Sequence, residues 1–181
     1  MKREELKRLV FSALFLAIGI VLPVFTGQIK EIGDSLLPMH LPVMLCGFIC
    51  GWKYGFTIGI ILPFIRSLTF GMPPLYPNAI WMAVELAAYG LVVGVLHAKM
   101  INLKRGRIAL PLIISMVVGR IAWGITKATL LGIGGKSFTV NAFIVGGFVD
   151  AIPGIIIQLI LIPLIVGIYE DSKIKTRRAK K

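Results

Sequence analysis

The 181-residue chain is poor in charge, and especially in acidic charge. Only 15% of its residues are charged, with eight Asp and Glu against twenty Lys and Arg, while 57% of the chain is hydrophobic. Soluble domains carry about 25% charged residues, and disordered chains have few hydrophobic ones. The composition therefore excludes both an ordinary soluble domain and a disordered chain.

Cysteine is scarce, and the common catalytic motifs are missing. Cys46 and Cys50 lie one helical turn apart in an apolar stretch, where a disulfide would crosslink only its own helix, so we expect two reduced thiols. The sequence has no His-Glu-x-x-His zinc pair, no Gly-x-Ser-x-Gly elbow and no phosphate-binding Walker loop. We therefore expect no catalytic residues, no metal site, no cofactor and no ATP hydrolysis by this chain itself.

Long apolar stretches are what the sequence has in abundance. A transmembrane helix needs about 20 mostly apolar residues. Six stretches predict an all-α integral membrane protein with six transmembrane helices, and residues 1–181 form a single transmembrane domain. The expected spans are Leu9 to Thr26, Leu37 to Gly51, Tyr54 to Phe70, Asn78 to His97, Ile108 to Leu131 and Asn141 to Tyr169.

Most basic residues lie at the two termini and in the connector after the fourth span. A net charge of +12 would suit nucleic acid in a soluble protein, but in these places it would face anionic lipid headgroups, so we expect no nucleic-acid partner. With six spans, one side receives fourteen Lys and Arg residues and the other only Lys30 and Lys136. Because Lys and Arg stay on the cytoplasmic side, we expect both termini to be cytoplasmic, in a multi-pass protein of the cell membrane.

Glycines recur every four residues at 47, 51, 55 and 59. This spacing lets helix backbones approach closely. We expect tight packing of the second and third spans.

Two predicted spans carry polar and aromatic side chains on one face. The residues of each stripe are three and four positions apart along the helix. With both termini in the cytoplasm, both stripes lie in the outer halves of their spans. An ionisable group inside the membrane costs at least ~2.5 kcal/mol, so these groups should face protein or water. The stripes are Asn78, Trp81 and Glu85 in the fourth span and Arg120, Trp123 and Lys127 in the fifth.

These stripes predict a pocket that opens to the outside. We expect the two indoles to stack on a ligand ring. Arg120 or Lys127 would receive an anionic or carbonyl group, and Glu85 and Asn78 would recognise donors. An alternative is that Glu85 and Asp150 pair with the two cations only to hold the helices together.

Other residues complete the predicted binding site. Asn141 lies near the outer end of the sixth span, Tyr76 lies in the proline-rich loop 71–77, and His40 begins the second span. His40 could instead be a satisfied hydrogen-bonding group, and the loop could cover the pocket or be a rigid connector. Asp150, three residues before Pro153, would either bind backbone N–H groups that the proline frees or belong to the pocket.

The pattern resembles the S components, the substrate-capturing membrane subunits, of energy-coupling-factor (ECF) vitamin transporters. Three features carry the resemblance. They are the six spans with basic cytoplasmic ends; Ala13-Leu-Phe-Leu-Ala17, similar to the family's Ala-x-x-x-Ala motif; and Pro38-Met39-His40-Leu41-Pro42 leading into Gly47 and Gly51.

The resemblance implies a function and partners. The chain would bind a water-soluble vitamin or precursor outside the cell, enclosed by the outer loops and the outer halves of the last three spans. A transmembrane coupling subunit, itself bound to two cytosolic ATPases, would drive uptake. Ala13 and Ala17 share a helix face and have almost no side chain, so we expect a partner helix to dock there.

Three other functions remain open from the sequence. A self-sufficient secondary transporter would use Glu85 or Asp150 to carry protons along an ion gradient. An intramembrane enzyme acting on lipid or isoprenoid substrates would use Glu85, His40 and Asp150 as acid-base groups. A structural assembly subunit would bind no ligand.

Overall fold

The computed structural model describes residues 3–25, 35–100, 103 and 106–178, and all the regular elements in these ranges are helices. The all-α class predicted from the apolar stretches is therefore confirmed. The longer helices are α1 (Arg3–Val21), α3 (His40–Cys50), α4 (Trp52–Phe70), α5 (Ile80–Met100), α6 (Ala109–Ile133) and α8 (Ile152–Arg178). Shorter turns of helix are η1 (Leu22–Val24), η2 (Leu75–Ala79), α7 (Val140–Ile144) and η3 (Val145–Val149).

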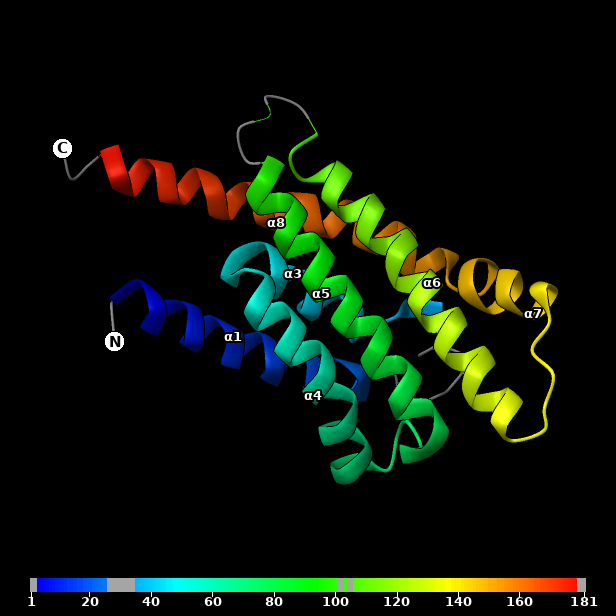
Figure 1. Ribbon diagram of the computed structural model, residues 1–181. Coiled ribbons are helices and arrows are strands. Elements are labelled where there is room, and N and C mark those ends of the chain that lie inside the picture. Colours follow the sequence, from blue (N-terminus) through cyan, green and yellow to red (C-terminus); the bar gives the residue numbers. More distant parts are fainter. Residues whose placement is uncertain (1–2, 26–34, 101–102, 104–105, 179–181) are drawn as a thin grey trace.

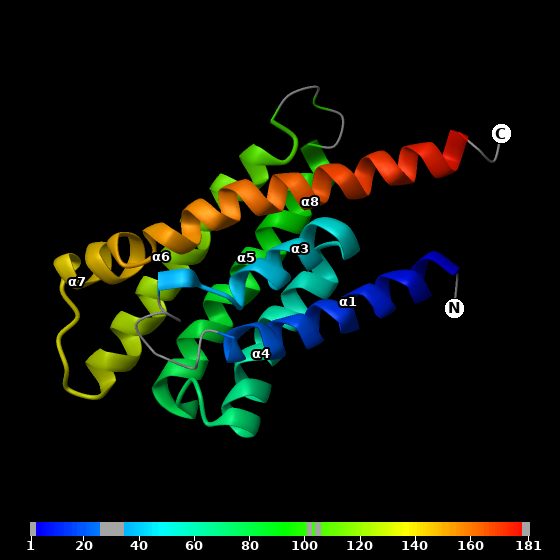
Figure 2. The ribbon, with the colours of Figure 1, turned by 180° about the vertical axis from the view of Figure 1, so that it is seen from behind.

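The helices form a bundle in which successive long helices run in opposite directions. In Figure 1, α5 lies between α4 and α6, and the N-terminal end of α1 and the C-terminal end of α8 lie at the same end of the molecule. Figure 2 shows α3 between α1 and α8 on the opposite face. We call the end that holds Arg8, Gly51, His97 and Lys173 the terminal end, and the opposite end the cavity end.

Length and apolar composition together divide the helices into two groups. Four helical stretches are long and apolar enough to cross a membrane: Arg3–Val24, Leu75–Met100, Ala109–Ile133 and Ile152–Lys173. Helix α4 falls outside this group although it has 19 residues. Helix α3 has 11 residues, which is about 16 Å at ~1.5 Å per residue, or half of a bilayer core of about 30 Å. Length and apolar composition together therefore support four crossings, and six crossings remain a prediction.

Two predicted spans contain turns that divide them in the structure. The second was expected from Leu37, but Leu37 has a φ of 50° and the helix begins at His40, after a turn. The sixth is interrupted at Asp150, where a turn separates η3 from α8, as expected ahead of Pro153. Thr26 at the predicted end of the first span and Lys30 in the predicted outer loop lie outside the described residues.

Helix α3 forms the centre of the bundle and packs against α1, α4, α5 and α8. Nine of its eleven residues are buried, which explains why its sequence is apolar on all sides of the helix. Cys46 and Cys50 are among them, and both are free thiols, as expected.

The predicted glycine packing is found, but its main partner is α5. A Cβ built on Gly55 of α4 would lie 2.8 Å from the Cα of Gly47 in α3 and 2.8 Å from the carbonyl oxygen of Gly90 in α5. A Cβ on Gly90 would in turn overlap the backbone of Gly55. Gly94, one turn further along α5, lies in the same way against the backbone of Trp52. The glycines thus let α4 and α5 touch backbone to backbone.

Candidate functional site

A cavity of about 630 Å³ opens at the cavity end of the bundle. Pockets for small ligands measure about 300–1,000 Å³, so the cavity has the size of a small organic molecule. Its wall comes from η1, the segment before α3, and helices α3 to α6, together with the turn ahead of α8. Seven of the nine residues predicted for the binding site line it: His40, Asn78, Trp81, Glu85, Arg120, Trp123 and Lys127.

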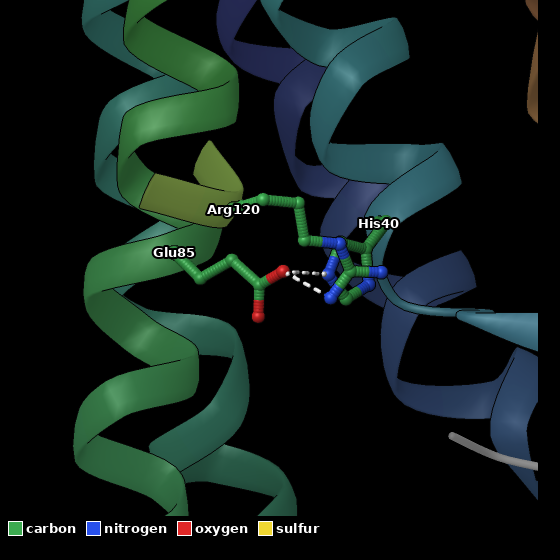
Figure 3. Close-up of polar contacts among 3 residues, drawn as sticks. All are labelled: His40, Glu85 and Arg120. Atoms are coloured by element: carbon green, nitrogen blue, oxygen red, sulfur yellow. Dashed lines mark hydrogen bonds and ion pairs between the residues drawn. The ribbon is translucent and has the colours of Figure 1, made fainter. Parts of the chain in front are cut away.

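Three of these residues meet on separate helices in the buried part of the wall (Figure 3). Arg120 on α6 donates from Nη1 to Oε1 of Glu85 on α5 at 2.8 Å, and Nε2 of His40 on α3 lies 3.2 Å from the same oxygen. Glu85 is 2% exposed and Arg120 4%. The ring of Tyr89 on α5 stacks edge-on against the His40 ring at 5.2 Å. The helix-holding ion pair expected as an alternative is therefore present for Glu85 and Arg120.

Some nitrogen atoms of Arg120 and His40 make no hydrogen bond within the described residues. Nε and Nη2 of Arg120 and Nδ1 of His40 are buried and have no hydrogen-bond partner among the described residues. A guanidinium carries five N–H donors, and leaving a buried donor unused costs about 1–3 kcal/mol. Arg120 also lines the cavity, so its guanidinium joins the ion pair with Glu85 to the cavity wall.

The ammonium group of Lys127 lies among three aromatic rings. Its Nζ is 4.5 Å from the ring centre of Trp123, 5.2 Å from that of Trp81 and 5.4 Å from that of Phe138. A cation over aromatic faces gains about 0.5–2 kcal/mol, with the larger values in dry surroundings. The two indoles that the sequence predicts as ring-stacking groups therefore lie next to the ammonium group of Lys127. A solute that carries both a ring and an anionic group would find an indole and a cation side by side.

Tyr76 and Asn141 are not on the cavity wall. Tyr76 is 61% exposed in η2, where its backbone leaves the helical conformation, and Asn141 is exposed on α7. The neighbouring loop does take part, because Met72, Pro73 and Pro74 line the cavity. The proline-rich segment is thus a piece of the wall, as in the pocket-covering alternative.

Asp150 lines the cavity, as in the alternative that placed it in the pocket, and so does Arg66, which was not included in the predicted binding site. Asp150 is exposed at the turn before α8 and forms no ion pair within the part of the chain that the structure describes. Arg66 is buried on α4, where it donates to the carbonyl oxygen of Ile20 and lies 5.0 Å from the ring of Phe70. Its signal in the sequence was a lone arginine within an apolar helix, which marks a site with a partner or a cavity.

The residues predicted for partner docking are accessible. Ala13 and Ala17 are exposed on α1, whereas Ser12, Phe15 and Gly19 on the other side of the helix are buried against the bundle. The structure leaves this small-residue face open, and docking itself stays a prediction.

Membrane-length apolar helices around a cavity with buried charges and aromatic rings define a class: membrane proteins with a chamber for a small solute. The family model for the substrate-specific component of ECF transporters matches residues 7–166, and the chain belongs to this family. It is a substrate-binding subunit of an ECF transporter. No curated protein and no solved structure matches the chain.

Proposed function

We propose that the chain captures a small water-soluble vitamin or vitamin precursor on the outer side of the cell membrane, for ATP-driven uptake through partner subunits. The observation that carries this proposal is the cavity of about 630 Å³ in which Trp81, Trp123, Lys127 and Arg120 converge. Indole faces supply flat apolar area, and the cations supply orientation. The substrate would then combine a planar ring with a carboxylate, phosphate or carbonyl group.

Binding by the purified full-length chain tests the site. Native mass spectrometry of gently purified protein would identify a retained small molecule, and calorimetric titration with that molecule would give its affinity. We expect Trp81→Ala and Arg120→Ala to weaken binding by at least about tenfold, while Trp52→Ala, which removes an indole at the terminal end, leaves it unchanged. Wild-type affinity in both cavity variants would refute the site.

We also propose that the chain crosses the membrane six times, with the terminal end in the cytoplasm. The alternating directions of the six longer helices and the basic residues at the terminal end support this orientation. The short α3 would cross together with the segment that precedes it. Single cysteines, introduced after Cys46→Ala and Cys50→Ala, provide the test. On intact cells, a membrane-impermeant maleimide should label Ser137→Cys in the loop before α7 and spare Ser172→Cys near the end of α8. The reverse labelling would overturn the orientation.

The partners would be a transmembrane coupling subunit and two cytosolic ATPases. The exposed face of Ala13 and Ala17 supports helix-to-helix docking, because two small residues one turn apart let another helix approach to van der Waals distance. The Walker loop that this chain lacks would then be supplied by the ATPases.

A further inference from the structure

A second cavity, of about 400 Å³, lies at the terminal end of the bundle. Five parts of the chain meet around it: the start of α1, the α3–α4 junction, the end of α5, the residues before α6, and the end of α8. It is separate from the cavity that holds Glu85 and Arg120, since no residue lines both. Its floor is apolar, and its charged wall residues are Arg8, Arg107, Lys173 and Glu170.

The single acidic group among the described wall residues is already engaged. Oε2 of Glu170 lies 2.7 Å from Nη2 of Arg107, and its Oε1 lies 3.1 Å from Nε2 of His97. Arg8 and Lys173 form no ion pair with any described residue. Two cations on different helices therefore border the cavity in addition to the neutralised pair, so the cavity carries a positive excess.

The surroundings of this cavity are those of a membrane boundary. Trp52 and Tyr169 line it, and these residue types concentrate where headgroups meet acyl chains. The Tyr169 ring contacts Phe11 edge-on at 6.1 Å and so joins α1 to α8 beside the cavity. From there exposed apolar side chains continue along both helices, among them Leu14 on α1 and Leu164 on α8. A molecule with an anionic head and apolar tails would match both surfaces at once.

We propose that the terminal-end cavity binds the phosphate group of an anionic phospholipid. Arg8 and Lys173 contact the phosphate oxygens, Trp52 and Tyr169 border the headgroup, and the acyl chains follow the apolar surfaces of α1 and α8. Basic pockets between membrane helices are suited to such headgroups, and juxtamembrane basic groups attract anionic lipid. The lipid would bridge α1 and α8, whose described residues make little direct contact with each other.

Native mass spectrometry of the full-length protein tests this site with defined lipids. Dioleoyl phosphatidylglycerol is titrated against dioleoyl phosphatidylcholine, which has the same chains and no net charge. We expect one phosphatidylglycerol molecule to remain bound at voltages that remove phosphatidylcholine. Dissolved glycerol 3-phosphate in a parallel titration separates a lipid headgroup from a free phosphate, and we expect it to bind at least about tenfold more weakly. Equal retention of the two lipids, or binding of glycerol phosphate alone, overturns the proposal.

A matched pair of double variants separates this site from general surface charge. Arg8→Gln/Lys173→Gln and Lys7→Gln/Lys99→Gln each remove two positive charges at the terminal end, but only the first pair lines the cavity. We expect the first to weaken phosphatidylglycerol binding by at least about tenfold and the second by less than about threefold. Arg8→Lys/Lys173→Arg, which keeps both charges, should bind as the wild type does. An unchanged thermal unfolding midpoint of Arg8→Gln/Lys173→Gln excludes loss of folding as the cause. Equal losses in the two charge-removing variants overturn the proposal.

Discussion

Glu85 and Arg120 face each other across α5 and α6 at 2.8 Å, within the wall of the larger cavity. One carboxylate oxygen accepts from Arg120 Nη1 and also lies 3.2 Å from the His40 imidazole, so three helices meet at one atom. Arg120 still has donors without a partner among the described residues. The sequence left two interpretations, a helix-holding ion pair and a binding group, and the geometry allows one arginine to do both.

Breaking this pair should destabilise the protein strongly. Glu85→Gln leaves the Arg120 guanidinium buried without its counter-charge, and removing one partner of a buried pair costs about 3–5 kcal/mol. We expect a clear drop in the thermal unfolding midpoint in detergent, partly restored in Glu85→Gln/Arg120→Met. Glu4→Gln, which removes an exposed ion pair with Lys7 at 3.6 Å, should change stability by less than about 1 kcal/mol. A double variant no more stable than Glu85→Gln would argue against this coupling.

Lys127→Met should weaken substrate binding while it preserves the fold. The substitution keeps much of the side-chain length, but it removes the cation that lies between the rings of Trp81 and Trp123. If the substrate carries an anionic group, we expect a loss of about ten- to a hundredfold in affinity by calorimetry. Lys136→Met, in the exposed loop before α7, serves as the control and should bind as the wild type does. Unchanged affinity in Lys127→Met would mean that the substrate carries its polar group elsewhere.

Gly90→Ala should disrupt the contact between α4 and α5. The added methyl group would overlap the backbone of Gly55, and a backbone cannot move aside as a flexible side chain can. Overpacking of this kind costs about 1–3 kcal/mol, so the unfolding midpoint should fall. Gly167→Ala in α8 is the matched control, because a Cβ there meets nothing within 4 Å. We expect it to be neutral or slightly stabilising, and a comparable loss there would contradict the explanation.

Bulk on the exposed face of α1 should block partner docking without affecting substrate binding. We expect Ala13→Trp and Ala17→Trp to lose copurification with the coupling subunit and the ATPases, since a small-residue face permits close approach only while it stays small. Ile18→Trp, which places an indole elsewhere on the exposed surface of the same helix, should assemble normally. Assembly of all three variants would mean that docking uses another surface.

The helices and the polar stripes could be predicted from the sequence, because both depend on the pattern of apolar and polar residues within one segment. Spacings of three and four residues place Asn78, Trp81 and Glu85 on one face of a helix whatever packs against it. Six of the seven predicted site residues that line the larger cavity belong to the two stripes, and the seventh, His40, was predicted from its place at the start of the second span. Tyr76 and Asn141 were chosen by their position in the chain alone, in a loop and near the end of a span, and both lie off the wall.

Features that several segments form together could not be predicted from the sequence. The second cavity joins residues from Arg8 to Lys173, and no local spacing connects them. The glycines of α4 predicted close packing, but the sequence did not reveal that Gly90 on α5 was the main partner. The length of α3 was missed because its apolar stretch starts before the turn at Leu37, which interrupts the helix but not the hydrophobicity.

The short length of α3 has a consequence for the larger cavity. A helix of 11 residues covers about 16 Å of a 30 Å hydrocarbon layer, and the non-helical segment before it, with Leu37, Pro38 and Met39, lines the larger cavity. His40 is the first residue of the helix and lines the larger cavity, so the cavity lies where further turns of α3 would otherwise lie. The short central helix α3 thus leaves space within the bundle, and in the proposed function this space holds the solute.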